Sequence, residues 1–506
     1  MRGIVQGLFD AADRFATRIA VSHRGEQLTY EQLCGHVIRL ACRLDAAGVR
    51  SGDRVAIALN NSPEFIVAVY ASMLVGAIAV PLDAGARSAE FSYWLRHCDP
   101  RLIIANLDNI DMEAALKNMP GAQSWLSAPD LANSLDTPRG DVIKAQYLRT
   151  RLATDAQNES GLMLYTSGST GRPKGVMLGG MNLASNADAI VEYLGLTSSD
   201  SSVVVLPFHY SYGSSVLHTH LRVGAHLRLC DNFAFPHLVV EALARTRASG
   251  FAGVASTFEL LLARVDLSRY DLSELRYVTQ AGGPMSAVLQ ARLRRALPHC
   301  QLFRMYGQTE AAARLTYLPP ADLDRKPGSV GIPIARTRLQ IRNDAGDVLG
   351  SEARGHIWAQ GPGIMAGYWR DRAGTAAVLQ DGWLNTGDMG YLDEDGYLYL
   401  VGRRTDMIKV GAHRVHPEEV EAVIAGMPKV QEVAAFGIED PLLGQAVKVL
   451  VVAPGAGLDS QAVKNYCKCR MAGHKVPKVV RFVDALPKTA SGKIRRRWLA
   501  DHEEEL

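Results

Sequence analysis

The sequence lacks the features that mark several common classes of protein. Its seven cysteines are scattered over 506 residues and form no C-x-x-C pair, which argues against a zinc ribbon or a dithiol redox site. The formal net charge is only +3, so overall electrostatics favour neither a nucleic acid nor a membrane surface as partner. The most apolar stretch, residues 65–80, is shorter than the ~20 residues of a membrane span. We therefore expect a cytoplasmic protein with reduced thiols, no nucleic-acid partner and no membrane insertion.

Two catalytic motifs are also absent. The chain has no G-x-S-x-G segment, and its histidines show no spacing typical of a Ser-His-Asp triad, so hydrolysis by an activated serine is not expected. The Walker spacing G-x-x-x-x-G-K-[ST] is missing too, which argues against a P-loop. What remains is an ordinary globular composition, and the chain is long enough to bury a large core without disulfides or structural metal.

The order of hydrophobic patterns predicts an α/β protein. Short apolar runs of the kind that form buried strands alternate with longer patterns of helical period. The clearest apolar runs are residues 54–59, 77–81, 102–105, 203–207 and 250–254.

The pattern changes in the last third of the chain. From about residue 355 it predicts short strands and tight turns, with a hairpin turn at 393–397, and the last hundred residues predict a small α+β unit. We expect an N-terminal domain at 1–402, a hinge at 403–406 and a C-terminal domain at 407–506.

One segment has the composition of a phosphate-binding loop. Residues 165–177 read YTSGSTGRPKGVM, and such a concentration of glycine and hydroxyl side chains packs poorly in a regular element. Backbone N–H groups, hydroxyls and a lysine together suit the wrapping of a polyanion. Apolar runs on both sides predict a strand–loop–strand arrangement. The residues expected to surround the phosphates are Thr166, Ser167, Gly168, Ser169, Thr170, Gly171 and Lys174.

This loop resembles the phosphate-binding signature of the adenylate-forming superfamily of acyl-CoA synthetases, nonribosomal-peptide adenylation domains and beetle luciferases. Other segments resemble that family's signatures in the same order, among them MYGQTE at 305–310, WLNTGD at 383–388 and PKTASGK at 487–493. The resemblance covers residues 8 to 500 or so. It implies a ligase that uses ATP and Mg²⁺ to convert a carboxylic acid into acyl-AMP and pyrophosphate, and then passes the acyl group to a thiol.

The resemblance also implies a fold. The N-terminal domain is expected to be layered α/β, with two mixed sheets, helices and a small β-barrel-like subdomain. The C-terminal α+β domain is expected to be mobile. At the hinge this chain has Thr405, where the family typically has aspartate or lysine, so the pivot residue stays open.

Roles in nucleotide binding follow from the same resemblance. It implies that Tyr306, next to Gly307, stacks on adenine, that Thr309 contacts the α-phosphate and that Glu310 binds Mg²⁺. A carboxylate is a natural ligand for Mg²⁺ beside phosphates. Asp388 is implied to accept hydrogen bonds from the ribose hydroxyls, a good geometric match for a carboxylate.

Five further positions are implied for the nucleotide and the thiol. Arg403 reaches the ribose or a phosphate, Gly282 and Gly283 form the turn where the acyl carboxylate and adenine approach the backbone, and Lys409 and Gly411 line the thiol tunnel.

The resemblance places Lys493 in the active site as the catalytic lysine. Its role has an electrostatic reason, because a carboxylate must attack the α-phosphate of a nucleotide that is itself strongly negative. A cation that bridges the acyl oxygen and the α-phosphate offsets that repulsion in the transition state.

The acyl pocket is expected around segment 206–213, LPFHYSYG. By resemblance Tyr210 takes the gating position, and Ser211 stands where enzymes that activate α-amino acids carry an aspartate. Because a buried ammonium without a counter-ion is costly, we expect a substrate without an α-amino group. The expected pocket residues are Tyr210, Ser211, Tyr212, Ala281 and Ala311.

Three alternatives stay open. The thiol belongs either to CoA or to the phosphopantetheine arm of a carrier protein, which would act in trans because no carrier domain follows Arg496. A second hypothesis is a stand-alone amino-acid adenylating enzyme of a peptide or siderophore pathway, which Ser211 disfavours. The third is a nucleotide-binding protein without catalysis, which the intact catalytic positions disfavour.

Overall fold

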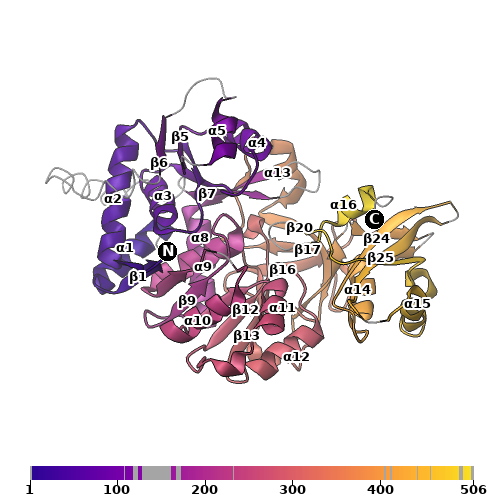
Figure 1. The fold of residues 1–506 in the computed structure, drawn as a ribbon. Coiled ribbons are helices and arrows are strands. Elements are labelled where there is room, and N and C mark those ends of the chain that lie inside the picture. The colour runs from indigo at the N-terminus through magenta and orange to yellow at the C-terminus, as the bar shows by residue number, and fades with distance from the viewer. Residues whose placement is uncertain are drawn as a thin grey trace.

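The computed structural model describes residues 3–106, 109–117, 124–127, 161–166, 173–231, 233–403, 406–410, 413–441, 443–455, 457–488 and 494–502. The elements up to β21 form a large part, and the C-terminal elements gather in a smaller unit at one end of it (Figure 1). Within the described residues, no helix has both the length and the apolar character that a bilayer crossing requires.

Two large sheets form the body of the molecule. In spatial order, the first contains β15 (Ile332–Pro333), β14 (Thr316–Leu318), β13 (Gln301–Tyr306), β12 (Tyr277–Gln280), β11 (Gly250–Gly253), β9 (Ser201–Val204), β10 (His226–Leu229), β1 (Ile19–His23) and β2 (Glu26–Thr29). The second contains β18 (Gly367–Tyr368), β8 (Lys174–Gly179), β7 (Gly161–Thr166), β4 (Ile78–Pro81), β3 (Arg54–Ala58), β5 (Leu102–Ala105) and β6 (Ser124–Ser127). Both are mixed, since the inner strands pair in parallel and antiparallel pairs lie toward the edges, which confirms the predicted sheets.

Helices cover and separate these sheets. They are α1 (Ile4–Phe15), α2 (Tyr30–Ala46), α3 (Pro63–Leu74), α4 (Ser88–Cys98), α5 (Ile110–Lys117), α8 (Gly180–Leu194), α9 (Ser211–Val223), α10 (Pro236–Thr246), α11 (Ala255–Arg264), α12 (Ala287–Ala296) and α13 (Arg372–Val378). One apolar cluster joins residues of α3, α8 and α9 to residues of both sheets, so these helices pack between the sheets. The start of α3 follows from its sequence, because Ser62 accepts a hydrogen bond from the backbone N–H of Phe65 and Pro63 occupies the first turn.

A third sheet contains β16 (Arg338–Arg342), β17 (Gly355–Gln360), β20 (Trp383–Leu392), β19 (Leu379–Gln380) and β21 (Leu398–Arg403). It is the predicted region of short strands, and it curls as half of a barrel. The predicted hairpin turn at 393–397 joins β20 to β21, which pair antiparallel.

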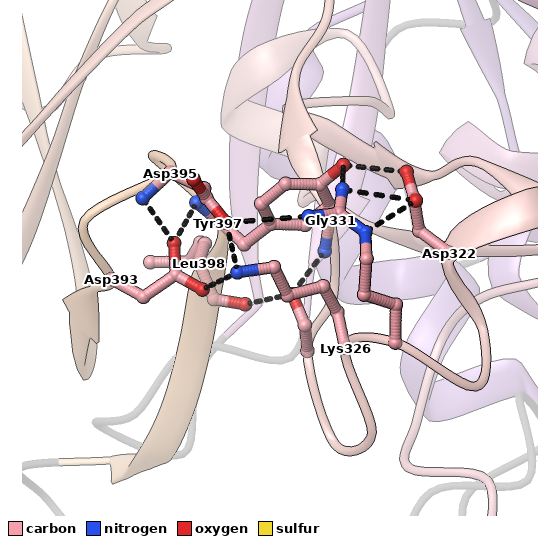
Figure 2. A network of polar contacts seen from close by, with 9 residues as sticks. Asp322, Lys326, Gly331, Asp393, Asp395, Tyr397 and Leu398 are labelled. Atoms are coloured by element: carbon pink, nitrogen blue, oxygen red, sulfur yellow. Dashed lines mark hydrogen bonds and ion pairs between the residues drawn. The ribbon is translucent and has the colours of Figure 1, made fainter.

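A polar network holds this hairpin against the rest of the large part (Figure 2). Lys326 Nζ lies 2.7 Å from an Asp393 oxygen and also contacts Asp395. The hydroxyl of Tyr397 donates to Asp322, and the backbone of Leu398 bonds to residues 330 and 331. The network fixes the direction of β21, which leads to Arg403 and the expected hinge.

The C-terminal unit has its own core. It contains β22 (Ile408–Val410), β23 (His413–Val415), α14 (Pro417–Ala425), β24 (Glu432–Asp440), β25 (Gly444–Val452), α15 (Ser460–Lys468), β26 (Val479–Phe482) and α16 (Arg496–Asp501). Apolar residues of its helices and strands form clusters separate from those of the large part. This is the predicted α+β unit, and its α14 packs against β21.

Candidate active site

The predicted strand–loop–strand is confirmed on both sides of the glycine-rich segment. β7 and β8 pair antiparallel, and Thr166 at the end of β7 lies opposite Lys174 at the start of β8. Ser167, Gly168, Ser169, Thr170 and Gly171 lie outside the described residues. Lys174 Nζ lies 3.6 Å from an Asp371 oxygen and 4.5 Å from the ring centre of Tyr368. The two strand ends that the loop connects are therefore neighbours in the sheet, and Lys174 lies at one of them.

The segment after β13 folds back on itself. A Cβ on Gly307 would lie 2.1 Å from the carbonyl oxygen of Ala313, so only glycine fits there. Next to it, the amide Nε2 of Gln308 is buried without a hydrogen-bond partner among the described residues. An unpartnered buried donor is uncommon in proteins and fits a site that a polar ligand completes.

Thr309 and Glu310 form a short 3₁₀ turn at the end of this segment. The Thr309 hydroxyl donates to the hydroxyl of Ser211 at 3.2 Å. Glu310 Oε1 accepts a hydrogen bond from the Tyr368 hydroxyl at 3.0 Å, and burial raises the pKa of that tyrosine, with Glu310 contributing. No described residue bonds to the second carboxylate oxygen of Glu310. Tyr368 thus lies between Lys174 and Glu310.

Tyr306 and Asp388 meet although they are 82 residues apart. Tyr306 ends β13 and Asp388 lies within β20, and the tyrosine hydroxyl donates to Asp388 Oδ2 at 2.7 Å. Both side chains are buried, at 8% and 7% exposure. The backbone of Arg403 in β21 lies directly opposite Asp388. The structure therefore brings together residues that the sequence assigned to adenine and to ribose.

The glycine turn after β12 leaves open space at its apex. Gly282 has φ +84°, a left-handed conformation that favours glycine. A Cβ built on Gly283 would meet nothing within 4 Å. The buried Gln280 amide donates to the carbonyls of Ala281 and Gly283 and holds the turn in shape.

The expected acyl-pocket residues lie on three elements. Tyr210 caps the N-terminus of α9, Ser211 begins it, and the Tyr212 hydroxyl bonds to the backbone and side chain of Thr279 in β12. Ala281 follows β12, and Ala311 follows Glu310. Burial raises the pKa of Tyr210 to about 12, so its hydroxyl is neutral. The structure gathers these residues around the start of α9.

The C-terminal positions are described only in part. Lys409 is exposed on β22, whereas Gly411 and Lys493 lie outside the described residues, as does the side chain of Arg403. Lys488 and Ile494, the described residues before and after this part of the chain, form an antiparallel bridge.

Two site residues carried no role in the sequence analysis. Tyr368 lies in a segment of aromatic and glycine residues, and its contact with Glu310 depends on the pairing of β18 with β8, which no local pattern reveals. Asn186 of α8 donates to the carbonyls of Ala311 and Arg314 and anchors the segment after Glu310. Its position within an ordinary helical pattern gave no signal.

This arrangement defines a nucleotide-dependent ligase, and comparison with known proteins gives the family. Residues 8–369 match the family model of AMP-binding enzymes, and residues 419–493 match the model of the AMP-binding enzyme C-terminal domain. The chain belongs to the AMP-binding enzyme family, which is the adenylate-forming superfamily.

Relatives align over nearly the whole chain. A feruloyl-CoA synthase from Amycolatopsis sp is 35% identical over 95% of this chain and 96% of its own length, and the oxalate–CoA ligase of Arabidopsis thaliana is 32% identical over 98% and 97%. The o-succinylbenzoate CoA synthetase of Bacillus subtilis, solved with its acyl-adenylate intermediate, superposes with a TM-score of 0.86 at 27% identity over 97% of both chains. The same enzyme in complex with ATP and magnesium gives 0.85 at 28% identity, over 97% of this chain and 98% of that one. The chain is an AMP-forming acid–thiol ligase that uses ATP and Mg²⁺.

The described residues fit these two cofactors. No group of three or more His, Cys, Asp or Glu side chains within the described part of the chain could hold a metal alone. Glu310 is a single carboxylate with one oxygen that accepts no hydrogen bond from a described residue. Such a ligand is expected when Mg²⁺ is bound jointly by the protein and by substrate phosphates. The orphaned Gln308 amide and the open apex at Gly283 provide a donor and space for the nucleotide.

Proposed function

We propose that this ligase joins a carboxylic acid without an α-amino group to the thiol of CoA. The hydrogen bond between Tyr306 and Asp388 is the main support, since it joins the expected adenine and ribose contacts in one buried pair. The names of the relatives support CoA as the thiol, although the acids they name are as different as ferulate and oxalate.

The nucleotide is held by groups at the strand ends. Asp388 accepts hydrogen bonds from the ribose hydroxyls, and its orientation depends on the Tyr306 hydroxyl. Adenine stacks on the Tyr306 ring. Thr166, Lys174 and Thr309, with Ser167, Gly168, Ser169, Thr170 and Gly171, donate to the phosphates, and Arg403 reaches the ribose or a phosphate.

Glu310 is the protein's ligand for Mg²⁺, and Tyr368 orients it through the bond to Oε1. The metal, when bound, neutralises charge on the phosphates. The acid binds with its carboxylate at the turn of Gly282 and Gly283 and its remaining atoms beside Tyr210, Tyr212, Ala281 and Ala311.

Lys493 supplies the positive charge between the attacking carboxylate and the α-phosphate. The large and small parts meet at a hinge at 403–406, which separates domains at 1–402 and 407–506. Rotation about this hinge moves Lys493 out of the active site and brings Lys409 and Gly411 into it. There Lys409 and Gly411 line the path of the thiol in the second step.

An acid without an α-amino group agrees with the surroundings of Ser211. Its hydroxyl accepts from Thr309, and no carboxylate among the described residues bonds to it. An ammonium group would have no counter-ion there and would be costly to bury. A stand-alone amino-acid adenylating enzyme is therefore disfavoured.

The test is product analysis by mass spectrometry of a mixed pool of aliphatic, aryl and amino acids with ATP. CoA and a phosphopantetheinylated carrier protein are offered separately. We expect AMP, pyrophosphate and an acyl-CoA. An acylated carrier protein without acyl-CoA would refute the choice of thiol, and turnover of amino acids alone would refute the choice of acid.

Variants of the C-terminal segment test the proposed catalytic lysine. Lys493→Ala should slow acyl-AMP formation by about 10²–10³-fold, while thioester formation from preformed acyl-AMP is largely retained. Lys488→Ala is the matched control, because Lys488 pairs with Glu432 at 2.7 Å and has no proposed role in catalysis. Equal losses in both half-reactions would contradict the assignment of Lys493.

A further inference from the structure

A buried arginine lies just behind the expected acyl pocket. Arg314 follows Glu310 by four residues and is only 2% exposed. Its Nε donates to the Tyr193 hydroxyl at 3.2 Å, and its guanidinium stacks 4.9 Å from the ring centre of Tyr212. No described residue accepts a hydrogen bond from its two terminal amino groups, and no described carboxylate lies within ion-pair distance.

Burial of a guanidinium without a counter-ion is unfavourable. Stacking on Tyr212 offsets part of the lost hydration, but buried charges in proteins are normally paired with the opposite charge. Asp200, a buried acid that packs beside Tyr277, is already bonded to Arg276 and Ser249. A bound anion would supply the counter-ion that Arg314 lacks among the described residues and so account for its buried position.

The backbone before Arg314 is held in an unusual conformation. Ala312 has φ +52° and Ala313 has φ +102°, both in the region that side-chain-bearing residues rarely adopt. Two hydrogen bonds from the Asn186 amide, to the carbonyls of Ala311 and Arg314, hold the segment in place. Such strain persists where surrounding contacts enforce it and commonly marks a binding site. Here the strained backbone directly precedes Arg314, whose side chain is buried.

The arginine faces a small cavity. Tyr193, Tyr212, Thr219, His220 and Thr279 line it with Arg314, and none of its lining residues is acidic. Burial lowers the pKa of His220 to about 4, so the guanidinium is the one charged group among the described lining residues. The volume is about 10 Å³, room for one water molecule. A carboxylate oxygen can take the place of that water and accept a charge-assisted hydrogen bond from the guanidinium.

The cavity adjoins the expected acyl pocket. Tyr212 follows Ser211 in α9, and Thr279 precedes Ala281 by two residues on the same strand end. Ser215 lines this cavity and also a second one that Ser211 and Ala312 line, so the two cavities flank the first turns of α9. Tyr212, one of the expected pocket residues, lies against the guanidinium of Arg314 and links the expected acyl pocket to this cavity.

We propose that the acid activated by this ligase carries a second, distal carboxylate, which the guanidinium of Arg314 binds. The inference rests on the proposed function and names its substrate class. A hydrogen bond from a guanidinium to a carboxylate oxygen is charge-assisted and has a fixed direction, which the mobile ammonium of lysine does not reproduce. When a monoacid occupies the site, the buried charge of Arg314 stays unpaired, which is unfavourable. Arg314 therefore selects diacids.

The test compares pairs of acids of equal length, each a monoacid and its α,ω-dicarboxylate, from three to six carbons and with an aryl pair. Pyrophosphate release reports adenylation. The wild-type enzyme should favour at least one diacid over its partner by about 100-fold in kcat/KM. Arg314→Met should lower kcat/KM for the diacid by about 100-fold and change it for the monoacid by less than about threefold, while Arg314→Lys is intermediate.

Arg342→Met is the matched control. Arg342 stacks 4.5 Å from the ring centre of Trp358 in the third sheet, away from the pocket, so its loss removes a similar cation–π contact and should leave the diacid preference unchanged.

Three outcomes overturn the inference. The first is a wild-type enzyme that activates monoacids as well as diacids, a result that needs no folded variant. The second is an equal loss for both members of each pair in Arg314→Met. The third is an equal thermal shift in both proteins, which can be measured even if no acid supports pyrophosphate release and the proposed function fails. Thermal unfolding then decides the inference separately: diacids should raise the Tm of the wild-type protein more than that of Arg314→Met, and equal shifts overturn it.

Discussion

Replacement of Glu418 by glutamine should remove a pH-dependent loss of stability from the C-terminal unit. Glu418 lies at the start of α14, where one oxygen is 3.0 Å from Arg496 and the other is buried without a hydrogen-bond partner among the described residues. Burial raises the pKa of Glu418 to about 7, with Glu421 and Asp406 adding to the shift and Arg496 opposing it.

The sign of the effect follows from the two pKa values. Between about pH 4.5 and 7 the folded state keeps a proton on Glu418 that the unfolded state has released, so the stabilising contribution is complete below pH 4.5 and is lost as the pH rises through 7. The full shift corresponds to at most about 3 kcal/mol. Because the side chain is 28% exposed, we expect about 1–2 kcal/mol.

The measurement is urea unfolding at pH 5.0 and pH 7.5, followed by circular dichroism and by the fluorescence of tryptophans that include Trp498 of α16. Glu418→Gln should reduce the fall in stability between the two pH values by about 1–2 kcal/mol. Glu439→Gln is the control, since Glu439 is exposed on β24 of the same unit. Identical falls in wild type and Glu418→Gln would refute the reasoning.

Three further predictions concern the active site. A double-mutant cycle of Tyr306→Phe and Asp388→Ala should show a coupling of about 1–3 kcal/mol in kcat/KM for ATP, because each mutation removes the same buried hydrogen bond; additive effects would contradict it. Tyr368→Phe should raise the Mg²⁺ concentration for half-maximal rate by about tenfold, since Glu310 loses its orienting donor, and an unchanged Mg²⁺ titration would argue against that role. Gly307→Ala should lower kcat/KM by about 100-fold because the added methyl collides with a backbone carbonyl; wild-type rates would show that the segment can shift freely.

The sequence predicted the elements well where local pattern decides them. The apolar runs at 54–59 and 102–105 became β3 and β5, and the run at 250–254 contains β11. In these segments hydrophobic period, caps and turn residues all agree. The strand–loop–strand around the glycine-rich segment was predicted for the same reason, since two apolar runs bracket residues that cannot form a regular element.

Local sequence patterns could not predict contacts between segments that are distant in the sequence. The resemblance grouped Tyr306 with Asp388 through their roles, but their direct hydrogen bond depends on how β13 and β20 approach in different sheets. Arg314 was missed altogether, because three alanines before it gave no sign of a left-handed backbone. A glycine in a sequence indicates that a left-handed backbone conformation is possible, whereas an alanine gives no such indication.

The ion cluster around Arg496 explains how the catalytic segment and the hinge are joined. Arg496 contacts Asp406, the last residue of the proposed hinge, at 3.5 Å, Glu418 in α14 at 3.0 Å and Glu421 at 2.6 Å. Its own helix begins two residues after Ile494, which forms a bridge with Lys488 and directly follows the proposed catalytic lysine in the sequence. A partly buried arginine with three acidic partners is hard to separate from them, since removal of one partner leaves charge unpaired. The hinge end, α14 and the lysine segment are therefore expected to turn as one body, so rotation at 403–406 carries the lysine without remodelling the unit that holds it.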